Sequence, residues 1–188
     1  MKIAILALQG AFEEHQKMLA CLGVDSFLVR NLNDWNQPKD ALVIPGGEST
    51  AMLRIMNDEH LFEPLRCAIM DGLPVMGTCA GMILLAKNVE NDSRERLATM
   101  DITVLRNAYG RQLGSFYVDG NVEGVGENLP MTFIRAPYIM SVGDGVEVLA
   151  VVDGKIVAAR QKSQLVCSFH PELTDDLRIH QFFLSMVE

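Results

Sequence analysis

The sequence holds few of the residues that build disulfide frameworks or thiolate metal sites. Its four cysteines are irregularly spaced and none forms a CxxC pair, so we expect free thiols and no metal or cofactor site. Long apolar runs are also absent. No stretch approaches the roughly 18 residues of a membrane span, and Gln9 ends the N-terminal apolar run short of a signal-peptide core. These absences predict a cytoplasmic protein with no membrane partner.

The sequence also has no excess of positively charged residues. The chain has 16 Lys and Arg residues against 24 Asp and Glu residues, which gives a formal net charge of −8 at pH 7. Binding to nucleic acid relies on clustered basic side chains that displace counterions from phosphates, and here the basic residues are scattered. We therefore expect no nucleic-acid partner.

The first half of the chain alternates apolar strand-like runs with helical patterns. With 188 residues, 49% of them hydrophobic, the chain can form one core, and we expect a single domain over residues 1–188. The strand-like runs are residues 3–8, 26–31, 41–47 and 73–79, and the helical patterns are residues 12–23, 49–71 (broken near 57–60 or before Pro64) and 80–89. This order predicts a parallel sheet with helices on both faces and ligands at the carboxyl ends of the strands.

Shorter strand-like runs follow beyond residue 100. They are residues 102–107, 115–123, 131–136, 146–152, 155–161 and 165–170. Asp153 and Gly154 predict a tight hairpin turn between two of them. The segment 174–188 has the pattern of a closing helix with Thr174 as its N-cap. The predicted fold class is α/β, with a mostly parallel central sheet and an antiparallel extension in the C-terminal half.

The stretch GTCAG at 77–81 has the spacing of a nucleophile elbow, in which a strand turns sharply into a helix. Gly77 and Gly81 would relieve the crowding of that turn, and Cys79 would project from the strand end toward the N–H groups of the helix, which stabilise a thiolate. The alternative is that Cys79 is a small packing residue. The remaining cysteines are expected to be structural: Cys21, Cys67 and Cys167.

A thiolate nucleophile needs a group that delivers a proton to the leaving group, and histidine is the usual one. His170, in SFHPE, directly follows an apolar strand at the expected ligand edge of the sheet. Pro171 should keep the backbone extended, which would place Glu172 on the same side as His170 and let it orient the imidazole. Alternatively, His170 only ends a strand. The other histidines are expected in solvent: His15, His60 and His180.

Acyl chemistry also needs backbone donors for a developing oxyanion. The N–H of Ala80, directly after Cys79, is one candidate. A second lies in IPGGEST, where Gly46 and Gly47 let backbone amides approach a ligand, and we assign the second donor to Gly47. A phosphate loop is the alternative for this segment, but the GxxxxGK[ST] pattern is missing.

Six short motifs, in order along the chain, resemble one subfamily of the triad-type (class I) glutamine amidotransferases. They are LQGAFEEH (8–15), PGGEST (45–50), GTCAGMILLA (77–86), RNAYGRQ (106–112), FIRAP (133–137) and SFHPELTDD (168–176). The subfamily is the glutaminase subunit of pyridoxal 5′-phosphate synthase, the PdxT/SNO family. The resemblance covers essentially the whole chain and implies a three-layer class I glutamine amidotransferase fold.

The resemblance implies a function and a set of site residues. Members hydrolyse the side-chain amide of L-glutamine through a Cys-His-Glu triad and pass ammonia to the synthase subunit, whose docking activates them; neither metal nor cofactor takes part. The triad maps onto Cys79, His170 and Glu172. The residues matching the glutamine contacts are Gly46, Gly47, Glu48, Arg106, Ile134 and Arg135. The chain departs mildly from the family at Tyr109, where phenylalanine is usual, in the stretch SFYVDGNV, and at Cys167, where a small residue is usual.

Two other readings of the same residues stay open at this point. The first is a cysteine hydrolase or stress protein of the DJ-1/PfpI type on a similar fold, although proteases of that type tend to carry His directly after the cysteine, where this chain has Ala80. The second is a binding module without catalysis. An intact set of Cys79, His170 and Glu172 argues against the second reading.

Overall fold

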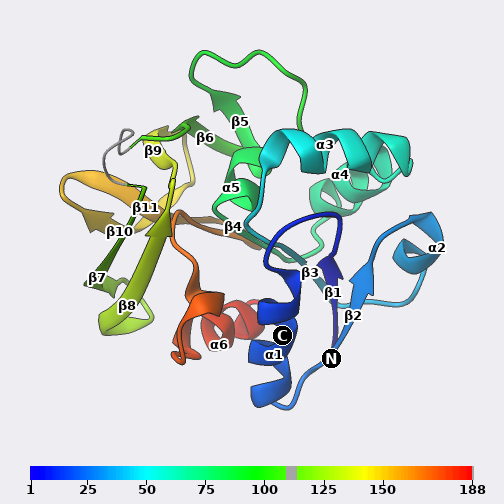
Figure 1. Ribbon diagram of the computed structural model, residues 1–188, viewed down its shortest axis with the longest axis horizontal. Coiled ribbons are helices and arrows are strands. Elements are labelled where there is room, and N and C mark those ends of the chain that lie inside the picture. Colours follow the sequence, from blue (N-terminus) through cyan, green and yellow to red (C-terminus); the bar gives the residue numbers. More distant parts are fainter. Residues whose placement is uncertain (109–113, 188) are drawn as a thin grey trace.

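The computed structural model describes residues 1–108 and 114–187 (Figure 1). In these residues ten strands form one sheet, with β2-β1-β3-β4-β12-β11-β9-β6-β5 as neighbours in order and β10 paired to β11, while β7 and β8 form a separate hairpin. The strands are β1 (Lys2–Leu6), β2 (Asp25–Val29), β3 (Ala41–Ile44), β4 (Val75–Thr78), β5 (Ala86–Val89), β6 (Met100–Leu105), β7 (Ser115–Val122), β8 (Gly126–Ile134), β9 (Tyr138–Val142), β10 (Glu147–Val152), β11 (Lys155–Gln161) and β12 (Gln164–Cys167).

Helices lie between successive strands of the first half and after the last strand, β12. They are α1 (Phe12–Cys21), α2 (Leu32–Trp35), α3 (Ser49–Asp58), α4 (Phe62–Met70), α5 (Ala80–Leu85) and α6 (Arg178–Ser185), with a 3₁₀ turn η1 (Pro171–Leu173) between β12 and α6. No helix among the described residues is both long enough and apolar enough to cross a membrane.

The parallel half of the sheet is covered on both faces. β2, β1, β3, β4 and β12 run parallel to one another, and along β1 the side chains of Ile3 and Ile5 enter one core while Ala4 and Leu6 enter the other. α3, α4 and α5 pack on the second of these faces. α1, α6 and the β7–β8 hairpin pack on the first, and Figure 1 shows α1 and α6 on the side opposite α3 and α4. The predicted α/β class, with its mostly parallel sheet and antiparallel extension, is confirmed.

Several element boundaries differ from the sequence-based expectation. The helix expected over 80–89 ends at Leu85, and Ala86–Val89 becomes β5, which pairs parallel with β6. By contrast, the break expected near 57–60 in the pattern over 49–71 is confirmed, because α3 and α4 are separated where His60 adopts a positive φ of 57°. Neither α2 nor β9 was expected. The predicted hairpin turn at Asp153 and Gly154 is confirmed, because both have positive φ and Val152 pairs with Lys155.

The closing helix begins later than expected. α6 starts at Arg178, and Thr174 is not its N-cap. Thr174 instead follows η1, and its hydroxyl oxygen accepts a hydrogen bond from the N–H of Asp176 at 3.3 Å. The segment before the helix therefore forms a separate turn, and that turn carries Glu172.

Candidate active site

The carboxyl ends of four parallel strands meet at one edge of the sheet and surround a cavity of about 510 Å³. Gln9 and Gly10 follow β1, the Gly46–Gly47 pair follows β3, Cys79 follows β4 and His170 follows β12. The residues lining the cavity are Gln9, Gly10, Ala11, Gly46, Gly47, Glu48, Ser49, Cys79, Ile83, Arg106, Asn107, Ile134, Arg135, His170 and Leu173.

Cys79 occupies a sharp turn between β4 and α5. Its φ of 49° and ψ of −100° are unusual for a residue with a side chain, and such strain gathers at functional sites. The turn needs glycine at 81, because a Cβ there would lie 2.1 Å from the carbonyl oxygen of Ile44. The Cys79 side chain is mostly buried but borders the cavity, and its Sγ donates a weak hydrogen bond to the carbonyl of Ile134 at 3.9 Å. This is the geometry of a nucleophile elbow.

His170 lines the same cavity as Cys79 and is held by Glu172. The two side chains form a 2.6 Å contact between His170 Nδ1 and Glu172 Oε1, and Glu172 is buried behind the imidazole, away from the cavity. The expected extended backbone is wrong, because Pro171 starts the 3₁₀ turn η1. Proline suits the first position of such a turn since its fixed φ is helical and its missing N–H is not needed there.

The electrostatics of this pair favour an imidazolium next to a carboxylate. Burial by itself would lower the pKa of His170, but its hydrogen bonds to Cys79 and Glu172 outweigh burial and raise that pKa to about 10. Burial would likewise raise the pKa of Glu172, but the neighbouring His15 and His170 lower it. The pair therefore holds a proton on the histidine at the cavity wall.

Two histidines expected in solvent are instead completely buried, and that expectation is wrong. His15 on α1 and His180 on α6 have no exposed surface, whereas His60 is exposed as expected. The neighbouring Glu13 and Glu14 suggested a solvated helix face. The signal that could have placed His15 is its spacing four residues before Leu19, which is in the core.

The loop after β3 packs closely on the histidine. A Cβ at Gly46 would lie 2.2 Å from His170 Cε1, so only glycine fits there. Glu48 begins α3 as its N-cap, and its carboxylate accepts hydrogen bonds from the N–H groups of Thr50 and Ala51 at 3.0 and 2.7 Å. The amide oxygen of Gln9 accepts the N–H of Glu48 at 2.5 Å, which ties the β1 and β3 loops together.

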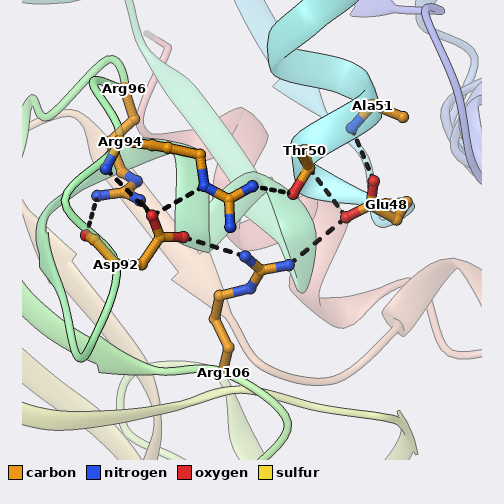
Figure 2. Close-up of polar contacts among 7 residues, drawn as sticks. All are labelled: Glu48, Thr50, Ala51, Asp92, Arg94, Arg96 and Arg106. Atoms are coloured by element: carbon orange, nitrogen blue, oxygen red, sulfur yellow. Dashed lines mark hydrogen bonds and ion pairs between the residues drawn. The ribbon is translucent and has the colours of Figure 1, made fainter.

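Arg106 extends from the end of β6 toward Glu48 and is supported from behind by Asp92 (Figure 2). Its Nη1 donates to Asp92 Oδ2 at 3.1 Å, and its Nη2 lies 3.5 Å from Glu48 Oε1. Asp92 also accepts from the guanidinium groups of Arg94 (2.9 Å) and Arg96 (3.0 Å). Burial would raise the pKa of Asp92, but the hydrogen bonds and charges of these arginines outweigh it and lower the pKa to about 2. Asp92 is thus an ionised anchor for a cavity-lining arginine.

Most of the expected site residues border this one cavity, and sequence reasoning missed several others. Glu172 and Ala80 lie behind the lining, Glu172 behind His170 and Ala80 as the first residue of α5. The missed lining residues are Gln9, Gly10, Ala11, Ser49, Ile83, Asn107 and Leu173. The strand-end rule applied to β1 could have found the first two. The second half of RNAYGRQ, including Tyr109, lies outside the described residues. Within residues 1–108 and 114–187, no three His, Cys, Asp or Glu side chains are grouped to hold a metal ion.

The chain is similar to known proteins over nearly its full length. The model of the SNO glutamine amidotransferase family matches residues 5–188. A pyridoxal 5′-phosphate synthase subunit PdxT from Streptococcus pneumoniae serotype 2 is 58% identical, over 99% of this chain and 97% of that protein. At this identity and coverage the two proteins share a family and not only a fold.

Solved structures agree with this sequence similarity. A crystal structure described as a glutamine amidotransferase matches with a TM-score of 0.93 and 41% identity, over 98% of both chains. The structure of PurLQS from Thermotoga maritima, at 16% identity and a TM-score of 0.72 over 100% of this chain and 99% of that one, shares the fold alone. The family match and the close relative together decide the assignment, and this chain belongs to the SNO glutamine amidotransferase family.

Proposed function

We propose that this chain is the glutaminase subunit of a pyridoxal 5′-phosphate synthase, acting as one domain over residues 1–188. It would hydrolyse L-glutamine to glutamate and ammonia and deliver the ammonia to a synthase subunit. The observation that carries the proposal is that Cys79, His170 and Arg106 line one cavity in a member of this family, with His170 held by Glu172 at 2.6 Å. A nucleophile, a proton carrier and an anion-binding group are what this reaction needs.

The first half of the reaction uses the turn at Cys79. The Cys79 sulfur attacks the side-chain amide carbon of glutamine, and the N–H groups of Ala80 and Gly47 stabilise the oxyanion that forms. The C–N bond then breaks, and the proton held on His170 passes to the departing nitrogen, which leaves as ammonia. A glutamyl thioester remains on Cys79.

The second half uses the same histidine as a base. His170 takes a proton from water, the water oxygen bonds to the thioester carbon, and the carbon–sulfur bond breaks to release glutamate. Glu172 orients the imidazole and stabilises its charged form in both halves. The cycle returns Cys79 and His170 to their starting state.

Recognition of free glutamine follows from the charges around the cavity. A guanidinium fork suits a planar carboxylate, so we assign the α-carboxylate of glutamine to Arg106, which Asp92 holds in place. Glu48 lies beside Arg106 and offers a negative group for the α-ammonium, although it also caps α3. The positively charged Arg135 and the backbones of Gly46 and Ile134 complete the binding wall.

Partner and location are also part of the proposal. Relatives carry the name of a synthase subunit, which supports a complex in which ammonia passes directly to a second active site. All four cysteines lie within the described residues and are free thiols, which supports a cytoplasmic location.

Labelling with a glutamine-analogue diazoketone tests the nucleophile. In the presence of the synthase subunit we expect a single adduct by intact mass, which Cys79→Ala abolishes because the reagent alkylates the attacking sulfur. Cys21→Ala, which removes an exposed thiol outside the cavity, is the matched control and should retain the adduct. Glutamate release should be abolished in Cys79→Ala and normal in the control. An adduct that persists without Cys79, or a wild-type complex that releases no glutamate, would refute the proposal.

A further inference from the structure

The second oxygen of Glu172 has an unusual environment. Oε1 is bonded to His170, but Oε2 is buried and, among the described residues, accepts no regular hydrogen bond. A buried carboxylate oxygen without a partner is costly, so a polar group close to it matters. His15 is such a group: its Nε2 lies 3.4 Å from Oε2, with both side chains completely buried.

His15 is itself fixed by residues from two other elements. Its Nε2 lies 3.2 Å from the hydroxyl of Thr78, the residue directly before Cys79. Its Nδ1 lies 2.9 Å from Nε2 of His180 on α6. A line of side chains therefore runs from the cavity wall through Glu172 and His15 to His180, and it joins η1, α1 and α6 behind the site.

The contacts select one arrangement of protons on the two rings. If His15 donated from Nδ1 to His180, the lone pair on its Nε2 would face the carboxylate of Glu172, and the Nδ1–H of His180 would be a buried donor. Nδ1 of His180 has no partner among the described residues, and buried donors without acceptors are rare. If His180 instead donates from Nε2 to His15 Nδ1, the Nε2–H of His15 faces Glu172 and Thr78. The second arrangement leaves an unpaired acceptor at His180 Nδ1 in place of an unpaired buried donor, and it is the one that we adopt.

Burial is consistent with two neutral rings. Burial is the largest cause of the pKa shift of both histidines. It lowers the pKa of His15 and lowers that of His180 to about 3. A neutral N–H donor can hold the carboxylate without the full charge of a lysine or arginine, which would compete with the His170 imidazolium for Glu172.

We propose that His15, held in its Nε2–H tautomer by His180, is a positioning residue that orients Glu172 toward His170. The inference rests on the proposed glutaminase function and deepens it. His15 does not line the cavity, so it acts on the reaction only through Glu172. Its loss should therefore slow the chemical step and leave glutamine binding nearly unchanged.

A matched pair of substitutions separates this role from simple packing. The Nε2 of a glutamine side chain can reach the place of the histidine Nε2, whereas asparagine reaches only the place of Nδ1. In the complex with the synthase subunit, we expect His15→Asn to lower kcat by about tenfold to a hundredfold, as for other groups that orient a catalytic partner, with KM for glutamine within about twofold. His15→Gln should stay within about threefold of the wild-type kcat, because it retains an N–H at the Nε2 position, which lies 3.4 Å from Oε2 in the wild type. Equal kcat values for the two variants, or a normal kcat in His15→Asn, would overturn the role.

A measurement on the wild-type protein covers the case in which a variant does not fold. Long-range ¹H–¹⁵N spectra of the histidine-labelled chain distinguish Nδ1–H from Nε2–H tautomers, and His60→Gln helps to assign the signals. We expect His15 as the neutral Nε2–H form, and an Nδ1–H form would overturn the proposal even if the activity were normal. Absence of glutamate release by the wild-type complex would instead count against the proposed function, so the two failures are distinguishable.

Discussion

At the scale of single residues, the closest approach at the elbow is between Gly81 and Ile44. A Cβ at position 81 would lie 2.1 Å from the Ile44 carbonyl oxygen, and backbone on both sides prevents an easy shift. We expect Gly81→Ala to lower the free energy of unfolding by roughly 2 kcal/mol or more, the usual range for overpacking, and to slow diazoketone labelling. Urea denaturation and intact mass measure the two effects.

Gly114→Ala is the matched control for this substitution. A Cβ at Gly114 would meet no atom of the described residues within 4 Å. The control should unfold within about 0.5 kcal/mol of wild type. A Gly81→Ala protein as stable as the control would contradict the tight turn.

The sequence predicts the single residues at strand ends better than those behind them. Cys79 and His170 could be found because each follows an apolar run, and the ligand edge of a parallel sheet is known from topology alone. His15 and His180 could not, because their burial depends on how α1 and α6 pack against η1 and the sheet. A local pattern with two acidic neighbours, as at His15, does not carry that information.

At the scale of elements, the segment between β5 and β6 supports the cavity through Asp92. Asp92 holds Arg106, and Arg94 reaches across to the hydroxyl of Thr50 in α3, as Figure 2 shows. We expect Asp92→Asn to raise KM for glutamine about tenfold, since it weakens a charge-assisted hydrogen bond to Arg106, to which we assign the α-carboxylate of glutamine. The kcat should change less, because Cys79 and His170 are untouched. Steady-state kinetics with the synthase subunit measure both values.

Asp58→Asn is the matched control for the Asp92 substitution. Asp58 pairs with Arg54 on the exposed face of α3, away from the cavity, with both side chains more than half exposed. Such a surface pair contributes little, so KM and kcat should stay at wild-type values. If Asp92→Asn also left KM unchanged, Asp92 would not position Arg106.

The sequence predicts the type of an element where both of its faces are buried, but it does not predict where the element ends. The apolar runs of β1, β3 and β4 are buried on both faces, so composition alone reveals them. The segment after Cys79 is apolar in both α5 and the start of β5, and pairing of β5 with β6 decides where the helix ends. The expectation of an extended backbone at Pro171 was wrong because proline can begin a 3₁₀ turn as readily as it can continue an extended segment.

At the scale of the whole molecule, buried histidines of opposite behaviour shape the dependence of stability on pH. The pKa of His170 is raised to about 10, so its contribution is complete below the unfolded value of 6.5 and is lost as the pH rises toward 10. The pKa values of His15 and His180 are lowered. Below pH 6.5 these two histidines therefore bind protons in the unfolded chain but not in the folded chain, and the free energy of unfolding falls. Stability should therefore be greatest close to pH 6.5.

The lowered pKa values of Glu172 and Asp92 affect stability only below pH 4.5. Between pH 6.5 and 4.5 the change in stability comes from His15 and His180. In this window each neutral buried histidine should cost up to about 1.4 kcal/mol of unfolding free energy per pH unit. His180→Gln keeps an N–H for His15 but cannot take a proton, so we expect its free energy of unfolding, from urea titrations, to fall less steeply by about 1 kcal/mol per pH unit. His60→Gln removes an exposed histidine and should follow wild type. Parallel curves for His180→Gln and wild type would mean that His180 takes up a proton in the folded protein, and would contradict the neutral pair behind Glu172.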